Sequence, residues 1–333
     1  MKVAVIGAGA IGGLVGARLA KAGEDVTFLV RGANLETIAA HGIKLIEKDG
    51  TEHVERNVRA TEDYSRAGLQ DVVVLAVKAN QVDAVASKVP LLFGPETVVV
   101  TMQNGIPFWY FHRQAGPLEG RQVLSVDPTG RLIESIPAER LIGCVVYPAS
   151  DLVAPGVVRH VEGNRLPLGE LDGSRSERVQ RVAASFERAG FKSPVLDDIR
   201  SEIWLKLWGN LTFNPISALS HATLEGICRY PLTRALAASM MGEAERVANK
   251  LGISFRVSLE KRIAGAESVG AHKTSMLQDI EAGRAPEVDA LVGSVIELAR
   301  LTETPTPHID AVYALVKLLS TTMEERQGRL QMA

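Results

Sequence analysis

The sequence predicts an α/β fold over residues 1–197, followed by an all-helical domain over residues 198–333. In the first part, short apolar runs alternate with glycine turns and helical patterns, as buried parallel strands and their connecting helices do. Beyond residue 197 the apolar residues recur only with helical spacing. A chain of 333 residues also suits two domains better than one.

The composition favours a globular enzyme with small-molecule partners. Apolar residues make up 46% of the chain and charged residues 23%, which is enough to build large cores. The net charge is -2 and no block of like charges occurs, so we expect no nucleic-acid partner and no membrane surface. No apolar stretch reaches the length of a membrane span.

The cysteines and histidines predict neither a disulfide framework nor a metal site. Cys144 and Cys228 stand alone without Cys-x-x-Cys spacing, and the seven histidines are scattered. The thiols are expected to be buried in a reducing compartment, which predicts a cytoplasmic protein.

The first strand, Lys2–Ile6, leads into a glycine turn that opens a helical pattern, and Val26–Val30 is the next strand. Gly-x-Gly-x-x-Gly in this context predicts a Rossmann-type dinucleotide-binding domain spanning residues 1–197. The first glycine permits the tight turn, the second lets the backbone approach a pyrophosphate, and the third lets helix and strand pack closely. The helix amino terminus would then bind the phosphates. The predicted cofactor-binding residues of this turn are Gly7, Ala8, Gly9, Ala10, Ile11 and Gly12.

Arg31 follows the second strand, where an NAD-binding site usually carries an acidic residue for the ribose. A guanidinium there favours a 2'-phosphate, which it can grip in a bidentate way. NADP(H) is therefore the predicted cofactor. An arginine that is merely exposed after a strand is the alternative.

Two further apolar strands, at 72–77 and 97–102, end next to polar residues. Lys78-Ala79-Asn80-Gln81 follows the first of these strands and precedes an expected helix to about Val89, and Asn104 follows the second strand. Ligands gather beyond the carboxyl ends of parallel strands, so Lys78 and Asn104 are candidates for the cofactor site. A surface lysine and a simple Asn-Gly turn are the alternatives.

The rest of the first domain is expected to add short strands, some of them antiparallel, and one helix. The expected strands are 123–126, 141–147, 157–160, 166–168 and 194–196, and the helix covers 174–189.

In the second domain, Lys206, Asn210 and Asn214 recur every four residues and share one helix face. Their neighbours are tryptophans, leucines and a phenylalanine, so these polar groups need partners, which a substrate could supply. A buried amide ladder with a snorkelling lysine is the alternative. Pro215 is expected to kink or break this helix and to expose Asn214.

Ser275 and Glu287 precede or open further helical stretches, where capping is the commoner use of such residues. The remaining expected helices cover 231–251, 255–268, 287–302 and 308–323.

Together these motifs resemble the ketopantoate reductase (2-dehydropantoate 2-reductase) family across nearly the whole chain. The lysine and asparagine helix, with the later serine and glutamate, is the more specific part of the resemblance. The matching motifs are the glycine turn, Arg31, Val77-Lys78-x-x-Gln81, Gln103-Asn104-Gly105, Lys206-x-x-x-Asn210-x-x-x-Asn214-Pro215, Ser275-Met276-x-Gln278-Asp279 and Glu287-Val288-Asp289.

The resemblance implies that NADPH gives a hydride to the ketone of 2-dehydropantoate and that Lys206 protonates the alkoxide. The product would be pantoate for pantothenate and coenzyme A biosynthesis. By the same resemblance, Glu287 binds the substrate hydroxyl and helps to place Lys206, which makes these two the expected catalytic residues. The remaining implied contacts are Asn210 and Asn214 with the substrate, Ser275 with its carboxylate, and Asn104 near both substrate and nicotinamide.

Two positions depart from the family pattern, because His272 and Leu224 stand where asparagines are expected. The substrate could therefore be another small branched 2-oxo acid. A third hypothesis is a binding module that senses NADPH without turnover. The sequence leaves the oligomeric state open, with a homodimer as the candidate assembly.

Overall fold

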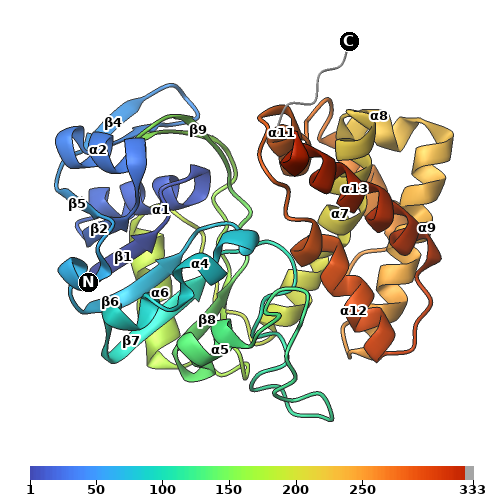
Figure 1. Ribbon diagram of the computed structural model, residues 1–333, viewed down its shortest axis with the longest axis horizontal. Helices are drawn as coiled ribbons and strands as arrows, with labels where there is room; N and C mark the ends of the chain where they lie inside the picture. The colour runs from blue at the N-terminus through green and yellow to red at the C-terminus, as the bar shows by residue number, and fades with distance from the viewer. Residues whose placement is uncertain (327–333) are drawn as a thin grey trace. The chain divides into compact units, whose positions relative to one another are not determined.

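The computed structural model describes residues 1–326 and divides into two compact units (Figure 1). The first unit comprises residues 1–104, 108–122 and 127–199, and the second comprises 105–107, 123–126 and the chain from Arg200 onward. The first unit is α/β and the second is built on helices, so the predicted fold class is confirmed. Two loop segments of the first half, 105–107 and 123–126, belong to the second unit. The predicted single boundary at residue 197 therefore does not describe the division completely.

A seven-stranded sheet forms the centre of the first unit. Its strands are β1 (Lys2–Ile6), β2 (Asp25–Leu29), β5 (Val58–Thr61), β6 (Gln70–Leu75), β7 (Phe93–Thr101), β8 (Leu141–Cys144) and β11 (Leu168–Glu170). They are arranged in the order β11-β8-β7-β6-β1-β2-β5, and only β11 runs antiparallel to its neighbour. The central strands are apolar and buried on both faces, as expected of parallel strands covered by helices.

A second sheet of four strands lies in the same unit, in the order β4-β3-β10-β9. Its strands are β3 (Ile43–Ile46), β4 (Glu52–Glu55), β9 (Ala149–Ala154) and β10 (Val157–Glu162). The hairpin of β9 and β10 is antiparallel, as expected for this region. Strands β3, β4 and β9 were not predicted, because β4 and β9 are largely exposed and polar and lack a continuous apolar run.

Helix α1 (Ala10–Lys21) packs against strands of both sheets. A Cβ atom on Gly16 would lie 2.4 Å from the ring of Phe28 on β2, and one on Gly13 would lie 2.4 Å from a methyl group of Val158 on β10. Only glycine at these two positions allows the helix to approach both sheets so closely.

Arg18 adds a polar link between α1 and the second sheet. Its Nη2 atom lies 2.5 Å from Oε2 of Glu47, just beyond β3, and 3.0 Å from Nδ1 of His160 on β10. Burial raises the pKa of the Glu47 carboxyl, but the hydrogen bond and charge of Arg18 outweigh it, and the pKa is lowered. The pair therefore stays ionised at neutral pH.

The other helices of the first unit only partly follow the prediction. They are α2 (Gly32–His41), α3 (Tyr64–Ala67), α4 (Asp83–Ala86), α5 (Arg131–Ser135) and α6 (Glu177–Arg188), with 3-10 turns η1 (Ala79–Gln81), η2 (Val89–Leu92) and η3 (Ala138–Arg140). The helix expected after Gln81 is present but shorter than predicted, because α4 ends at Ala86 and the 3-10 turn η2 begins at Val89. Pro90 within η2 cannot donate the hydrogen bond that would continue an α-helix.

Two predicted strands are also wrong. Residues 123–126 form a turn whose amides at Leu124 and Ser125 donate to the Glu297 carboxylate, at 2.8 and 2.7 Å. Residues 194–196 make only an isolated bridge, between Val195 and Leu168. Residues 123–126 have strand-like composition but pair with no strand, whereas residues 194–196 lie beside β11 and pair with it at Leu168 alone.

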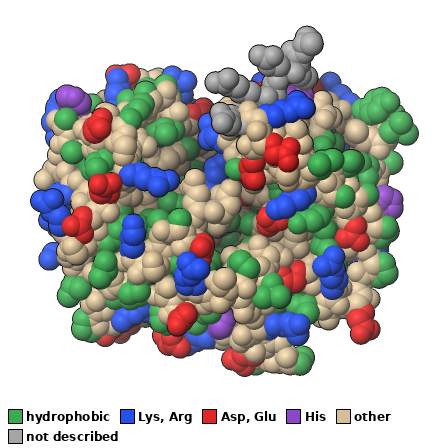
Figure 2. Space-filling view, in the orientation of Figure 1, with side chains coloured by type: hydrophobic (Ala, Val, Ile, Leu, Met, Phe, Trp, Pro, Cys, Tyr) green, Lys and Arg blue, Asp and Glu red, His purple; other side chains and the backbone are tan. Residues whose placement is uncertain are grey.

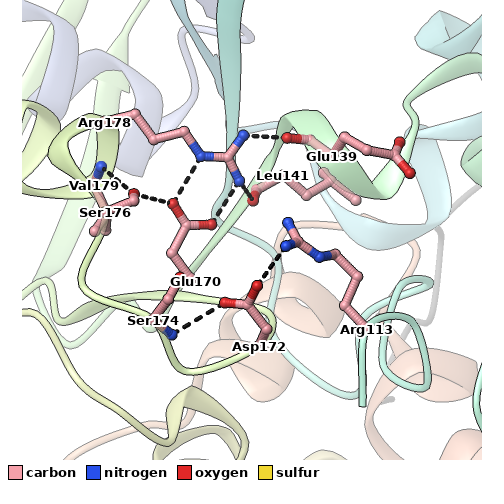
Figure 3. A network of polar contacts seen from close by, with 9 residues as sticks. All are labelled: Arg113, Glu139, Leu141, Glu170, Asp172, Ser174, Ser176, Arg178 and Val179. Atoms are coloured by element: carbon pink, nitrogen blue, oxygen red, sulfur yellow. Dashed lines mark hydrogen bonds and ion pairs between the residues drawn. The ribbon is translucent and has the colours of Figure 1, made fainter. Parts of the chain in front are cut away.

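Buried charge anchors the edge strand β11 to α6 (Figure 3). The Glu170 side chain is 2% exposed, and Arg178 donates to its two oxygens from Nε at 2.7 Å and Nη2 at 2.5 Å. Ser176, which also caps α6, donates to the same carboxylate at 2.5 Å. Arg178 further donates to the carbonyl oxygens of Glu139 and Leu141, so one guanidinium joins α6, β11 and the start of β8.

The helices of the second unit are α7 (Ile199–Ser220), α8 (Leu224–Arg229), α9 (Pro231–Lys250), α10 (Leu259–Ser268), α11 (Ser275–Glu281), α12 (Ser294–Leu301) and α13 (Pro307–Glu325), together with the π-helical turn η4 (Asp289–Gly293). Helix α7 starts at the last residue of the first unit.

The expected break at Pro215 is wrong, since α7 continues through it to Ser220. Asn214 is buried rather than exposed. A proline inside a helix costs about 3 kcal/mol, but every residue from Leu211 to Ala218 is buried, and this packing outweighs the local cost.

Several composition-based expectations can be compared with the described residues. Cys144 and Cys228 are buried and form no disulfide, as predicted. Within residues 1–326, no helix is long and apolar enough to cross a bilayer, and no cluster of three His, Cys, Asp or Glu side chains could hold a metal. Basic and acidic side chains are interspersed on the face seen in Figure 2, which agrees with the balanced composition.

Replacing Arg178 with Met should lower the free energy of unfolding by about 3–5 kcal/mol, because it leaves the buried Glu170 carboxylate uncompensated. Urea denaturation measures this change. The double variant Arg178→Met/Glu170→Gln removes the orphaned charge and should recover part of the loss. A double variant no more stable than the single one would contradict this account of the anchor.

Candidate functional site

The glycine turn between β1 and α1 has the backbone geometry that the sequence predicts. Gly7 has a φ of +94°, and its amide donates to the Leu29 carbonyl oxygen of β2 at 3.0 Å. A Cβ on Gly12 would lie 1.9 Å from the carbonyl oxygen of Gly7, so only glycine lets α1 start so close to β1. A Cβ on Gly9 would meet nothing within 4 Å. Gly9 therefore faces open space at the amino terminus of α1.

This open space suits a phosphate group. Ala10 and Ile11 lie in the first turn of α1, where backbone amides have no partner within the helix, and Ala8 is buried beneath the turn. No acidic side chain occupies that turn. Free amide donors and the helix dipole together favour an anion at this position.

Arg31 lies at the same edge of the sheet as the glycine turn. Strands β1 and β2 are parallel, with Ile6 opposite Leu29, so Gly7 and Arg31 both follow the carboxyl ends of adjacent strands. Arg31 is exposed and occupies the cap position of α2 without a side-chain capping bond. Its guanidinium is thus available near the start of α2.

Lys78 and Asn104 also follow carboxyl ends of adjacent strands, since Leu75 of β6 pairs with Thr101 of β7. Between these strand ends, the Gln103 side chain donates from Nε2 to the carbonyl oxygens of Leu75 at 2.8 Å and Val77 at 2.9 Å. The amide of Gln103 therefore fixes the strand ends that carry Lys78 and Asn104. The structure places all the predicted cofactor residues along one edge of one sheet.

Gly105 is more than the simple turn residue considered above. It has a φ of +92°, and a Cβ there would lie 2.1 Å from the carbonyl oxygen of Ala290 in η4. The next amide, of Ile106, donates to the same oxygen at 3.1 Å. Glycine is needed both for the turn and for this close approach.

In the second unit, α7 presents Lys206, Asn210 and Asn214 along one face. Lys206 and Asn210 are half-buried and Asn214 is 5% exposed. Trp208 holds the opposite side of the helix: it stacks on Phe255 with ring centroids 4.0 Å apart and donates to the Met241 carbonyl oxygen at 2.8 Å. The rotation of α7 about its axis, and hence the direction of the polar row, is fixed by this packing.

The row meets a second element at Asn214. Its Nδ2 atom lies 3.5 Å from the hydroxyl oxygen of Ser275, the first residue of α11. Thr274 caps α11 by accepting from the amide of Leu277 at 3.3 Å. The alternative that Ser275 caps this helix is therefore wrong. Ser275 is exposed and lies next to the amide of Asn214.

Glu287 is carried by a different element from Ser275 and α7. It immediately precedes the helical segment that begins at Val288 and contains η4, and its carbonyl oxygen accepts from the Leu291 amide at 3.2 Å. A π-helical turn is rare and often marks a functional position. Here Asp289 anchors it by accepting from the Tyr313 hydroxyl at 2.9 Å and from Lys317 at 2.6 Å.

The hydrogen bond from Tyr313 persists over the physiological pH range. Burial, followed by the bond to Asp289, raises the pKa of Tyr313 to about 12. The phenol therefore remains a donor, and the turn that follows Glu287 is held to α13.

Comparison with known proteins assigns both parts of the chain to one family. Residues 3–173 match the family model described as ketopantoate reductase PanE/ApbA, and residues 198–320 match its C-terminal counterpart. The chain belongs to the ketopantoate reductase family. Membership supports an oxidoreductase that uses a nicotinamide dinucleotide, as the glycine turn predicts.

Individual relatives agree with this assignment. A 2-dehydropantoate 2-reductase of Mesorhizobium japonicum is 53% identical over 96% of this chain and 98% of its own length. A Ralstonia solanacearum protein that bears the family name is 43% identical, and its crystal structure matches with a TM-score of 0.92 over 96% of this chain and 98% of that one. D-mandelate dehydrogenase, at 22% identity and a TM-score of 0.83, covering 97% of this chain and 99% of its own, shares the fold.

The two departures from the family pattern are neighbours in the structure. The Leu224 amide donates to the His272 carbonyl oxygen at 3.0 Å, where the start of α8 meets the loop before α11. Two amide side chains expected in ketopantoate reductases are thus replaced at one place. The replacement is local and leaves the row on α7 unchanged.

Two contributors were not predicted from the sequence. Gln103 clamps the strand ends beside Asn104, and a polar side chain directly after a buried strand is the signal that could have singled it out. Gly209 lies on α7 between Lys206 and Asn210, in contact with Arg262 of α10. An isolated glycine inside a helix signals a close approach, but not by which residue.

Replacing Gly9 with Ala should leave thermal stability unchanged, because its Cβ meets no atom, yet weaken NADPH binding at least about tenfold by filling the space next to the phosphates. Gly12→Ala should instead lower stability through its clash with Gly7. Fluorescence titration and thermal unfolding measure the two effects. Gly265→Ala, in another uncrowded helical position, is the control. Unchanged NADPH affinity in Gly9→Ala would contradict the phosphate assignment.

Proposed function

We propose that the chain reduces 2-dehydropantoate to (R)-pantoate with NADPH, a step of pantothenate and coenzyme A biosynthesis. The observation that carries the proposal is the row of Lys206, Asn210 and Asn214 on α7, in contact with Ser275. The family assignment and the 53% identity to a 2-dehydropantoate 2-reductase support it.

The row has the groups that reduction of a ketone requires. When bound, the nicotinamide supplies a hydride that adds to the ketone carbon, while the carbonyl electron pair moves onto the oxygen. The Lys206 ammonium donates its proton to that oxygen, which completes the alcohol and leaves a neutral amine. A new proton from solvent restores the ammonium. A half-buried cation next to the ketone also stabilises the negative charge that develops before proton transfer.

The remaining polar groups would hold the substrate. Asn210 and Asn214 offer amide donors and acceptors along the same helix face as Lys206. Ser275 would donate to the carboxylate, and Glu287 would accept from the substrate hydroxyl and help to place Lys206. Because each of these groups is fixed by a helix or a helix terminus, the ketone is oriented without a mobile loop.

We further propose that NADP(H) is preferred over NAD(H). The glycine turn with its first-turn amides suits the pyrophosphate, and Asn104 and Lys78 would lie near the nicotinamide and the phosphates. Arg31 would contact the 2'-phosphate, since it is exposed and follows β2, where an NAD-binding site carries a carboxylate.

A second candidate substrate is another small branched 2-oxo acid. The paired departures at Leu224 and His272 favour this alternative, because they remove two amide side chains from the site while retaining the reductive groups. A fold shared with D-mandelate dehydrogenase does not by itself fix the substrate. An NADPH sensor without turnover needs no proton donor, so Lys206 in the polar row argues against this third hypothesis.

Steady-state rates of NADPH oxidation with 2-dehydropantoate and related 2-oxo acids test the function. The wild-type protein should prefer 2-dehydropantoate, and Lys206→Ala should lower kcat about 100- to 10,000-fold, as loss of a general acid does, with NADPH affinity retained. Lys261→Ala, at an exposed position of α10, should be unaffected. Wild-type turnover in Lys206→Ala would refute the role of the lysine, and preference for another acid would refute the substrate.

Replacing Arg31 with Asp should reverse or abolish the preference for NADPH over NADH, because a carboxylate repels the 2'-phosphate and can accept from a ribose hydroxyl. The ratio of kcat/KM for the two cofactors measures this preference. Arg56→Asp is the matched control, since Arg56 is exposed and precedes β5, at the opposite edge of the sheet. An unchanged ratio in Arg31→Asp would exclude the proposed phosphate contact.

A further inference from the structure

The π-helical turn η4 changes the partner of one main-chain carbonyl group. In a regular α-helix the Ala290 carbonyl oxygen would accept from the amide of Ser294, four residues later. That amide donates instead to the carbonyl oxygen of Asp289, five residues earlier, which is the hydrogen bond of a π-turn. The Ala290 oxygen is therefore released from the backbone ladder of its own helix.

Two other donors use the released oxygen. The Ser294 hydroxyl donates to it at 2.7 Å, and the Ile106 amide donates to it at 3.1 Å. Gly105 permits this approach, because a Cβ there would lie 2.1 Å from the same oxygen. Ile106 is buried, so loss of the bond would leave a buried amide unsatisfied. The π-turn thus holds the segment that directly follows Asn104.

Asp289 attaches the turn to a second element. Its carboxylate accepts from the Tyr313 hydroxyl at 2.9 Å and from Lys317 at 2.6 Å, and these two side chains lie one helical turn apart on α13. The ring of Tyr313 also lies against Gly293, where a Cβ would stand 3.2 Å from it. The turn is therefore bonded both to α13 and to Ile106.

Glu287 directly precedes this helical segment. Its carbonyl oxygen accepts from the Leu291 amide at 3.2 Å, so its main chain is tied to the turn. Glu287 stands three residues before Ala290, and Asn104 stands two residues before Ile106. Under the proposed function, Glu287 would bind the substrate hydroxyl and Asn104 would lie near substrate and nicotinamide. The bond from Ile106 to Ala290 therefore connects two proposed site residues through short stretches of chain.

We propose that the π-helical turn is a positioning element of the reductase site. The released Ala290 carbonyl places the segment that carries Asn104, and Asp289 is a positioning residue that holds the turn, and with it Glu287, to α13. The inference rests on the proposed function. A displacement of about 1 Å at a reacting group can cost about a hundredfold in rate, so the attachment of this turn affects turnover directly.

The kinetic test uses two substitutions at Asp289. Asp289→Ala removes both bonds to α13 and should lower kcat about tenfold, while the KM for NADPH stays unchanged. Thermal stability should change little, because the Asp289 and Lys317 side chains are each 45% exposed. Asp289→Asn retains an acceptor for Tyr313 and should recover most of the loss in kcat. Glu260→Ala, which removes an exposed carboxylate of α10, is the matched control and should retain the wild-type kcat.

Hydrogen exchange tests the contact without turnover. The Ile106 amide should be protected in the wild-type protein and should exchange at least about tenfold faster in Asp289→Ala, because the turn that accepts from it is loosened. Amides of α7 should keep their wild-type rates in the same variant. Gly105→Ala displaces the Ala290 oxygen directly and should accelerate exchange at Ile106 in the same way. If Gly105→Ala fails to fold, Asp289→Ala decides the matter alone.

Three results would overturn the inference: wild-type kcat in Asp289→Ala, no recovery in Asp289→Asn, or unchanged exchange at Ile106. The kinetic assays use the 2-oxo acid that the wild-type protein prefers. The exchange measurement needs neither substrate nor cofactor, so its outcome is independent of the proposed function. Failure of 2-dehydropantoate as a substrate would count against the proposed function alone.

Discussion

The constraint on which the first unit depends is the close packing of helix α1 against the backbone and strands around it. Gly12 admits no side chain because the carbonyl oxygen of Gly7 fills that space, and Gly13 and Gly16 are closed in the same way by Val158 and Phe28. One helix is thereby seated between two sheets. The first-turn amides point to a fixed place beyond β1 as a consequence of this packing. Among the three glycines of the motif, Gly9 alone has open space beside it, which leaves room for a ligand.

Glycines that allow another element to approach closely also occur at the candidate site of the second unit. At Gly105, the space of a side chain is occupied by the Ala290 carbonyl oxygen of the π-helical turn. At Gly209, it is occupied by the guanidinium of Arg262. In each case the absent side chain is replaced by a polar group of another element. Helix α7 can carry both a glycine and a proline because its packing is otherwise dense: Trp208 stacks on Phe255, and the turn around Pro215 is buried. Tertiary burial outweighs the unfavourable local propensities.

The sequence predicted most accurately those features that depend on local spacing. The strand β1, the glycine turn and the row on α7 follow from apolar runs and from intervals of four residues, and the structure contains all three. Contacts between distant segments could not be predicted in this way. Residues 123–126 have strand composition but bind the Glu297 carboxylate, and Pro215 lies inside a helix that buries it. Similarly, no local pattern indicates that Arg262 fills the space at Gly209.

Cofactor and substrate preferences depend on different physical conditions. The selectivity proposed for Arg31 would come mainly from the charge of a 2'-phosphate, because Arg31 is exposed and can be altered without disturbing a core. The groups on α7 are half-buried or buried, where an unpaired polar group costs more than it does at the surface. A substrate that leaves Asn214 unsatisfied would therefore lose more binding free energy than a cofactor that does not contact Arg31. On this reasoning, the replacement of two expected amides by Leu224 and His272 would change the surroundings of the proposed substrate, while the polar row on α7 that would bind and protonate its 2-oxo group is retained.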